Sequence, residues 1–287
     1  MDSGLLQLRK LTLEDSQLVQ QMHTDIEDDY ILTIFPDLVS SEANGMFGLY
    51  SDQDLLAIAG YTLFPGGYAM LGRLRSDKRF HSKGHATEIL SQIRTQLERD
   101  PTVKWIGANT NINNKPARRV LEKLGFDEVT QLYSLAVQNP NLIEGLNGPI
   151  WNKVDSLEKK KSLLSNLYDN ALGVFPYECY YPFPYTEQLV TDEHLKDSHF
   201  FQNHDQSRFF IIRDDQKQDW FAQVKYFWND HFKQPGFWET IFYYVEHHPE
   251  QIQGWVEFSL QGYQNIPNKE AFEKSDGWVL YGKFKEK

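Results

Sequence analysis

The clearest pattern in the sequence is a helical spacing of apolar residues in two segments of the first half. The first segment ends before Pro101, and its apolar residues fall on one face of a helix, at Ala86, Ile89, Leu90, Ile93 and Leu97. The second segment begins at Asn114, a suitable helix N-cap, and ends at Gly125, which suits the left-handed residue that follows many helices. The pattern therefore predicts two well-marked helices.

Shorter apolar runs around these helices predict strands. We expect a hairpin over 46–64 and further strands over 5–11, 68–76, 104–110 and 127–137. A short helix is expected over 12–26, and an irregular apolar region ended by Pro36 follows it. The expected order is therefore strand, helix, three strands, helix, strand, helix and strand, which is an α/β arrangement with a mixed sheet.

The turn-rich stretch 138–150 predicts a boundary, and the composition changes after it. All tryptophans except Trp105 lie beyond residue 150. There we expect helices over 157–171 and 220–232, an extended segment over 173–187, and strands over 254–262 and 277–284. No internal repeat is evident. The predicted organisation is an α/β domain at 1–138, a linker at 139–150 and an α+β aromatic-rich domain at 151–287. A further hypothesis is that the last strand of this domain, over 277–284, returns to complete the sheet of the first domain.

Composition narrows the class of protein. The chain has 287 residues and a net charge of −11, which argues against a nucleic-acid or anionic-membrane binder because both need basic faces. The single cysteine excludes an intramolecular disulfide. No apolar run approaches a membrane span and no signal peptide is evident, so we expect a cytoplasmic protein. We expect no metal site.

The stretch HSKGHA, residues 81–86, is the candidate site. A glycine at the start of a helix lets backbone approach a ligand, and the free amides of the first helical turn favour an anion there. Lys83 adds a positive charge beside Gly84. These features suit a pyrophosphate, although many ordinary turns contain glycine and lysine.

The stretches HSKGHA and NKPARRVLEKLGF together resemble the GNAT family of N-acetyltransferases. The family's phosphate loop has Gln or Arg, two residues, Gly, one residue, and Gly or Ala, and only His81 departs from it. The second signature is met by Asn114, Ala117 and the run 123–126. The resemblance covers about residues 5–137.

The resemblance implies a site for acetyl-CoA. The backbone of Leu74, Arg75 and Ser76 would bind pantetheine, because the family separates its fourth strand from its fifth. The pyrophosphate would lie on the amides from 82 to 86, which belong to Ser82, Lys83, Gly84, His85 and Ala86, and His81 would adjoin them. Lys78 and Arg79 could reach the phosphates, and Asn114 would contact the cofactor or cap its helix.

The catalytic groups usual in the family are missing. Its carboxylate base and its tyrosine acid correspond here to Met70 and Leu121, which cannot transfer protons. Tyr133 is a replacement candidate for the acid. The acidic run Asp25, Glu27, Asp28 and Asp29 could attract an amine or supply a base, and Asp28 is the candidate there.

The expected reaction is transfer of acetyl to a primary amine by direct attack in a ternary complex. The acceptor is a small molecule or a peptide. Two alternatives stay open: a non-catalytic acyl-CoA-binding protein, motivated by Met70 and Leu121, and transfer of a longer acyl chain, motivated by the aromatic second half. Those aromatic residues could also form a core, an acceptor pocket or a homodimer interface.

Overall fold

The computed structural model describes all residues except 1–4, 25, 81–83, 218 and 287. Its contacts group the chain into two compact units. The first contains residues 1–109, 114–128 and 281–287, and the second contains residues 110–113 and 129–280. Each unit is therefore built from more than one stretch of the chain.

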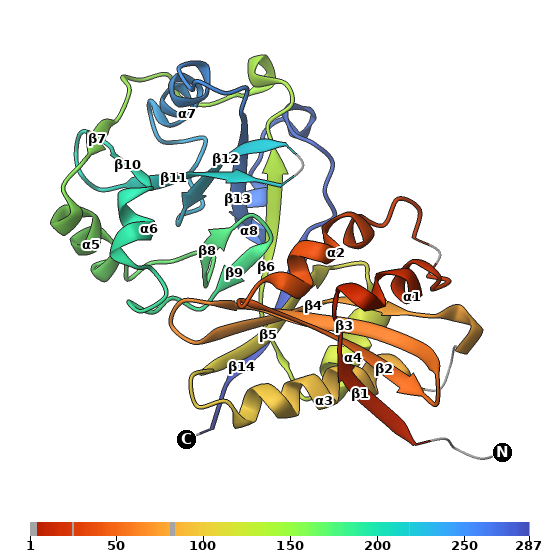
Figure 1. Ribbon diagram of the computed structural model, residues 1–287. Coiled ribbons are helices and arrows are strands. Elements are labelled where there is room, and N and C mark those ends of the chain that lie inside the picture. Colours follow the sequence, from red (N-terminus) through yellow and green to blue (C-terminus); the bar gives the residue numbers. More distant parts are fainter. Residues whose placement is uncertain (1–4, 25, 81–83, 218, 287) are drawn as a thin grey trace. The chain divides into compact units, whose positions relative to one another are not determined.

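The first unit is a mixed sheet with helices on both faces (Figure 1). Its strand order is β1-β2-β3-β4-β5-β14. The elements that lie wholly or partly in it are β1 (Leu6–Lys10), η1 (Leu13–Asp15), α1 (Ser16–Gln20), α2 (Tyr30–Ser40), β2 (Asn44–Ser51), β3 (Asp54–Phe64), β4 (Tyr68–Ser76), η2 (Lys78–Phe80), α3 (His85–Arg99), β5 (Trp105–Asn111), α4 (Lys115–Lys123) and the end of β14 (Trp278–Phe284).

Helices α1 and α2 cover one face of this sheet, and α3 covers the other (Figure 1). The apolar face of α3 predicted from the sequence is buried at Ile89, Leu90, Ile93 and Leu97. One correction concerns the apolar region around Pro36, where Tyr30–Ser40 forms α2 rather than an irregular segment. Pro36 lies inside that helix, because burial of Ile31, Phe35 and Leu38 on one face outweighs the loss of one backbone hydrogen bond.

The second unit is also a mixed sheet, with the strand order β6-β13-β12-β11-β10-β7. Its elements are most of β6 (Asp127–Ala136), η3 (Pro140–Leu142), β7 (Asn152–Val154), α5 (Leu157–Ser165), β8 (Phe175–Glu178), β9 (Tyr181–Phe183), α6 (Asp192–Lys196), β10 (His199–Gln202), β11 (Phe209–Gln216), β12 (Trp220–Tyr226), α7 (Phe237–Glu246), β13 (Gln253–Ser259), α8 (Leu260–Gln264), η4 (Lys269–Ala271) and the start of β14.

The side chains on the two faces of this second sheet differ in composition. Helix α7 packs through Phe237, Trp238 and Ile241 into an aromatic core that includes Val224 and Phe258. On the other face, a polar network links four side chains. The buried Lys225 donates to Gln223, which donates to Glu257, and Ser134 also donates to Glu257.

The expected helix over 220–232 was wrong, because residues 220–226 form β12. Ala222, Val224 and Tyr226 face the aromatic core, while Gln223 and Lys225 alternate with them on the other face. All five side chains are buried. The run from Ala222 to Tyr226 does alternate apolar and polar residues, but the aromatic residues on both sides of it, Trp220, Phe221, Phe227 and Trp228, break the alternation and fall at helical spacing, so the segment imitated a helix.

Strand β14 is divided between the two units. Residues 278–280 group with the second unit and residues 281–284 with the first. In the first unit the Lys285 amide donates to the Lys104 carbonyl at 2.8 Å, and the Lys285 ammonium donates to the Asp100 carbonyl at 2.6 Å. The Tyr281 hydroxyl reaches Glu122 of α4 at 3.2 Å. Residues 281–284 of this strand thus belong to the first unit.

Candidate active site

The separation of β4 from β5 defines the candidate cofactor cleft. The two strands are parallel and pair at four positions, from Tyr68 with Trp105 to Leu71 with Ala108. Their pairing then stops, although β4 continues to Ser76 and β5 to Asn111. Backbone of β4 beyond Leu71 therefore faces a gap rather than a neighbouring strand, which is the geometry that a ligand needs to pair with that backbone.

A bulge in β4 accompanies this separation. The register with β3 shifts between Ile58 and Gly60, so that Arg73 and Leu74 both lie opposite a single residue. Arg73 has a φ of 58°, and its guanidinium donates to the Thr62 hydroxyl at 2.9 Å. A bulge bends its strand and increases the local twist, which turns Leu74, Arg75 and Ser76 away from the line of β5.

An ion pair fixes Arg75 on this strand. Its guanidinium donates to both carboxylate oxygens of Asp29, at 2.6 and 2.8 Å, and also to the neighbouring Leu74 carbonyl at 2.9 Å. Asp29 is the N-cap of α2 and accepts from the Ile31 amide. Burial opposes ionisation of Asp29, but these hydrogen bonds outweigh it and lower the pKa. The pair ties α2 to β4.

The acidic run therefore divides into members with different roles. Asp29 is buried and committed to Arg75, so it is not available as a base. Glu27 and Asp28 are exposed, and Asp28 has a φ of 49° in the turn before α2. Asp25 lies outside the described residues. Glu27 and Asp28 are thus the described carboxylates of this run that can meet a substrate from solvent.

Asp77, which the sequence did not single out, organises the loop between β4 and α3. Its buried carboxylate accepts from the backbone amides of His23 and Arg79 and from the Arg79 guanidinium. The Arg79 hydrogen bond is the main cause that lowers the pKa of Asp77 to about 2. Arg79, proposed as a phosphate ligand, is therefore held by Asp77. Only the position of an acid directly after a strand signalled this residue.

The start of α3, where the sequence predicts a pyrophosphate seat, is described from Gly84 onward. Gly84 is the N-cap with a φ of 79°, a left-handed conformation that favours glycine. A Cβ placed on Gly84 would meet no atom within 4 Å, so the first unit leaves open space there. The first amide bonded within the helix is that of Glu88, to the Gly84 carbonyl. His81, Ser82 and Lys83 lie outside the described residues.

The structure clarifies the roles of three further positions, two at helix α4 and one on strand β4. Asn114 caps the helix, because its side chain accepts from the Ala117 amide at 3.2 Å. Leu121 of α4 and Met70 of β4 are buried apolar residues. Neither can replace the acid or base that the GNAT family usually carries at these positions.

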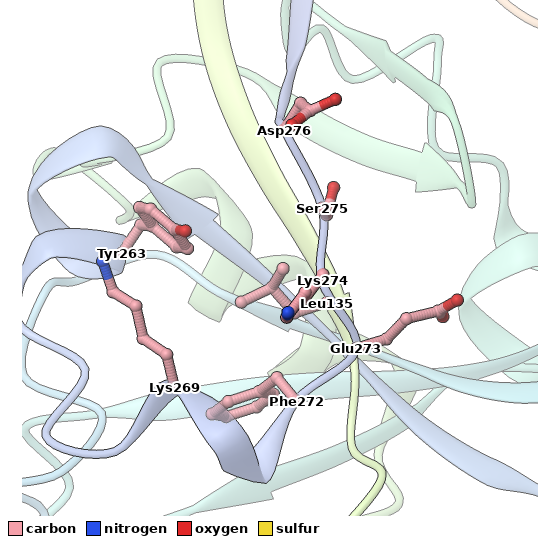
Figure 2. Close-up of a pocket in the computed structure, with 8 residues that line it drawn as sticks. All are labelled: Leu135, Tyr263, Lys269, Phe272, Glu273, Lys274, Ser275 and Asp276. Carbon is pink, nitrogen blue, oxygen red and sulfur yellow. The ribbon is translucent and has the colours of Figure 1, made fainter.

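Tyr133 lies in the second unit, on β6. Its ring stacks on Tyr263 with centroids 4.1 Å apart, and burial, with a smaller contribution from Tyr263, raises its pKa. A hollow of about 490 Å³ adjoins this stack, with Tyr263 and Lys269 on one side and residues 273–276 along the other (Figure 2). The Lys269 ammonium lies 3.9 Å from the centre of the Tyr263 ring. The hollow thus combines an aromatic wall with charged groups.

No metal-binding cluster of histidine, cysteine or carboxylate residues occurs in the described part of the chain. Within the same residues, no helix is long and apolar enough to cross a membrane.

Comparison with known proteins identifies the first part of the chain. Residues 6–127 match the family model described as "Acetyltransferase (GNAT) domain". The resemblance inferred from the two sequence signatures is therefore confirmed: residues 6–127 form a GNAT acetyltransferase domain. No curated protein matches the chain closely enough to count as a relative.

Two solved structures are similar over nearly the whole chain. One, from Thermoplasma acidophilum, is described as a "putative acetyltransferase"; it is 14% identical, with a TM-score of 0.52, and the match covers 96% of this chain and 91% of that one. The other, from Enterococcus faecalis, is described as a "Probable N-Acyltransferase"; it is 11% identical, with a TM-score of 0.50, and the match covers 99% of this chain and 73% of that one. At these identities the likeness concerns the fold.

Proposed function

We propose that the chain is an acyl-CoA-dependent N-acyltransferase that moves an acetyl group from acetyl-CoA to a primary amine. The observation that carries this proposal is the gap between β4 and β5 in the same unit as an uncovered, left-handed Gly84 at the start of α3. A strand edge can pair with the amides of pantetheine, and a helix N-terminus favours a pyrophosphate. The GNAT domain match at 6–127 supports the same reading.

In this proposal the chain holds the cofactor mainly through its backbone. The edge of β4 at Leu74, Arg75 and Ser76 binds the pantetheine arm. The amides of the first turn of α3, at Gly84, His85 and Ala86, bind the pyrophosphate together with residues 81–83. The Arg75–Asp29 pair keeps that edge in place, and Asp77 fixes the loop that leads to α3.

Acetyl-CoA supplies an activated acyl group: the amine nitrogen bonds to the thioester carbon, and the thiolate leaves as the C–S bond breaks. The amine must lose a proton, and Asp28, exposed in the acidic turn, is the proposed base. The thiolate must gain a proton, and Tyr133 is the proposed donor. Its raised pKa keeps the hydroxyl protonated near neutral pH, as a donor requires.

A second function is favoured by a specific observation. Met70 and Leu121 are buried apolar residues where the family usually has its base and acid, which suits a protein that binds acyl-CoA without transferring the acyl group. The aromatic core of the second unit motivates a longer acyl donor as a third candidate.

Calorimetry with acetyl-CoA and a thiol-release assay over a panel of small amines and peptides separates these functions. We expect cofactor binding and thiol release with at least one amine. Tight binding without release on any amine supports the binding protein. Faster release from a longer acyl-CoA supports the third candidate. No binding of any acyl-CoA refutes the proposal.

A further inference from the structure

The second unit repeats the strand pairing that forms the candidate cleft in the first. Strands β12 and β13 are parallel and pair at four positions, from Phe221 with Gln253 to Val224 with Val256. Pairing then stops while both strands continue, as it does between β4 and β5. Strand β11 pairs antiparallel with β12 just as β3 pairs with β4.

The connections repeat as well. In each unit the helix between the parallel strands, α3 or α7, begins at a left-handed glycine: Gly84 has φ 79° and ψ 12°, and Gly236 has φ 78° and ψ 0°. The helix after the fifth strand is capped by a side chain in both cases, Asn114 for α4 and Ser259 for α8. The sequence shows no repeat, but the order of helices and strands from β7 to β14 matches that from β1 to β6, apart from short 3-10 turns and the two strands β8 and β9 inserted between α5 and α6.

The units differ at the mouth of the helix. In the second unit the Gly236 amide donates to the Leu146 carbonyl at 3.1 Å. A Cβ on Gly236 would collide with the Pro149 carbonyl oxygen, and one on Gly148 would lie 2.6 Å from the Gly236 nitrogen. Trp151 donates its indole N–H to the Pro235 carbonyl. The chain itself therefore covers the place that is open at Gly84.

The gap beyond the paired strands is filled in the same unit. The Ala171 amide donates to the carbonyl of Phe227, the residue after β12, at 2.8 Å. The carbonyl of Leu172, the residue after Ala171, accepts from the Thr130 hydroxyl of β6 at 2.8 Å. Leu172 and Val174 are fully buried. Segment 170–174 thus makes the kind of backbone contact that the edge of β4 offers to a ligand.

We propose that the second unit is a second copy of the acyl-CoA-binding fold whose cleft is occupied by its own chain. Residues 146–149 occupy the place of the pyrophosphate, and residues 170–174 occupy the place of the pantetheine arm. The chain therefore binds one acyl-CoA, in the first unit. This inference rests on the proposed function of the first unit.

Calorimetry on the full chain tests the stoichiometry. We expect one acetyl-CoA per chain, and Gly84→Val to remove that single binding event. Two molecules bound per chain, or one full equivalent left in the Gly84→Val variant, overturns the proposal.

Two measurements test the occupied cleft without any cofactor, so they still decide the inference if acetyl-CoA does not bind at all. Hydrogen exchange on the free protein should show protection in peptides that contain Ala171 and Gly236, and acetyl-CoA should leave it unchanged. Rapid exchange there, or exposure on adding acetyl-CoA, overturns the proposal.

The second measurement is thermal melting. Gly236→Ala should lower the melting temperature by several degrees more than Gly84→Ala or Gly125→Ala. All three glycines are left-handed, but only at Gly236 does a Cβ meet another atom within 4 Å. Equal melting temperatures for the three variants mean that residues 146–149 do not cover Gly236, which overturns the proposal.

Discussion

Two helix starts of the same conformation face different surroundings. Gly84 opens α3 into space, whereas Gly236 opens α7 against Leu146 and Pro149. The same contrast holds for the separated strand pairs, since a chain segment fills the second gap through Ala171. A ligand-binding framework is therefore not itself a binding site. The framework can bind a ligand only if its backbone donors and acceptors are not already used by contacts within the chain.

The largest loss of stability should come from a substitution in the second unit, whose cleft is filled by its own chain. Glu257→Ala removes a buried carboxylate that accepts from Ser134, Gln223 and Trp255, and it leaves Asp215 as the remaining carboxylate near Lys225. Breaking a buried charged network of this kind costs about 4 kcal/mol. Urea unfolding should show that loss, with unchanged affinity for acetyl-CoA. Reduced affinity in the folded variant would mean that the second unit contributes to binding the cofactor.

A somewhat smaller loss of stability is expected from a substitution in the first unit, whose cleft is open. Asp29→Ala leaves the guanidinium of Arg75 buried without its partner, at a cost of about 3 kcal/mol. Asp28→Asn is the matched control: Asp28 is the exposed neighbour of Asp29, and asparagine tolerates its left-handed conformation, so stability should not change by more than about 0.5 kcal/mol. If Asp28 is the base, that control also slows thiol release. Equal stability losses in the two variants would contradict the assigned role of the pair.

Acid should weaken the loop that leads to α3. The pKa of Asp77 is lowered to about 2 from 3.8, so its contribution to stability is present above pH 4 and is lost as the pH falls toward 2. The shift corresponds to about 2 kcal/mol. The stability difference between the wild type and Asp77→Asn, measured by urea unfolding, should therefore shrink over that range. A difference that stays constant from pH 5 to 2 would refute it.

The smallest expected change is in the binding free energy of acetyl-CoA, and it tests the proposed pyrophosphate site at the start of α3. Gly84→Val places a branched side chain in a left-handed position, which should weaken acetyl-CoA binding at least about tenfold, or about 1.4 kcal/mol. Gly125→Val is the matched control, since Gly125 has a φ of 70° and open space as well. Calorimetry should find the affinity changed only at Gly84. Equal affinities in both variants would place the cofactor elsewhere.

Local patterns predicted the parts of the molecule that local forces determine. The face of α3, the cap at Asn114 and the glycine at 84 could all be read from spacing and residue type. The pairing of Arg75 with Asp29 could not, because 46 residues separate the two side chains and nothing local requires their meeting.

The second unit resisted prediction for a related reason. In strand β12 the alternation of apolar residues with Gln223 and Lys225 is short, and the flanking aromatic residues at helical spacing hide it. Its likeness to the first unit lies in which strands pair and where pairing stops, and neither is encoded by a shared motif. The residues that fill its cleft have the sequence of an ordinary turn-rich stretch. Nothing in that sequence indicates which residues they contact.

The division of β14 bears on how the protein is made. Residues 281–284 belong to the unit that residue 6 begins, so contacts such as that of Lys285 with Lys104 join positions far apart in the chain. Contacts of such long sequence separation slow folding, and a chain emerging from the ribosome normally folds its first domain early. Here the domain at 6–127 is completed only once residues 281–284 have been made, long after its own segment has been synthesised.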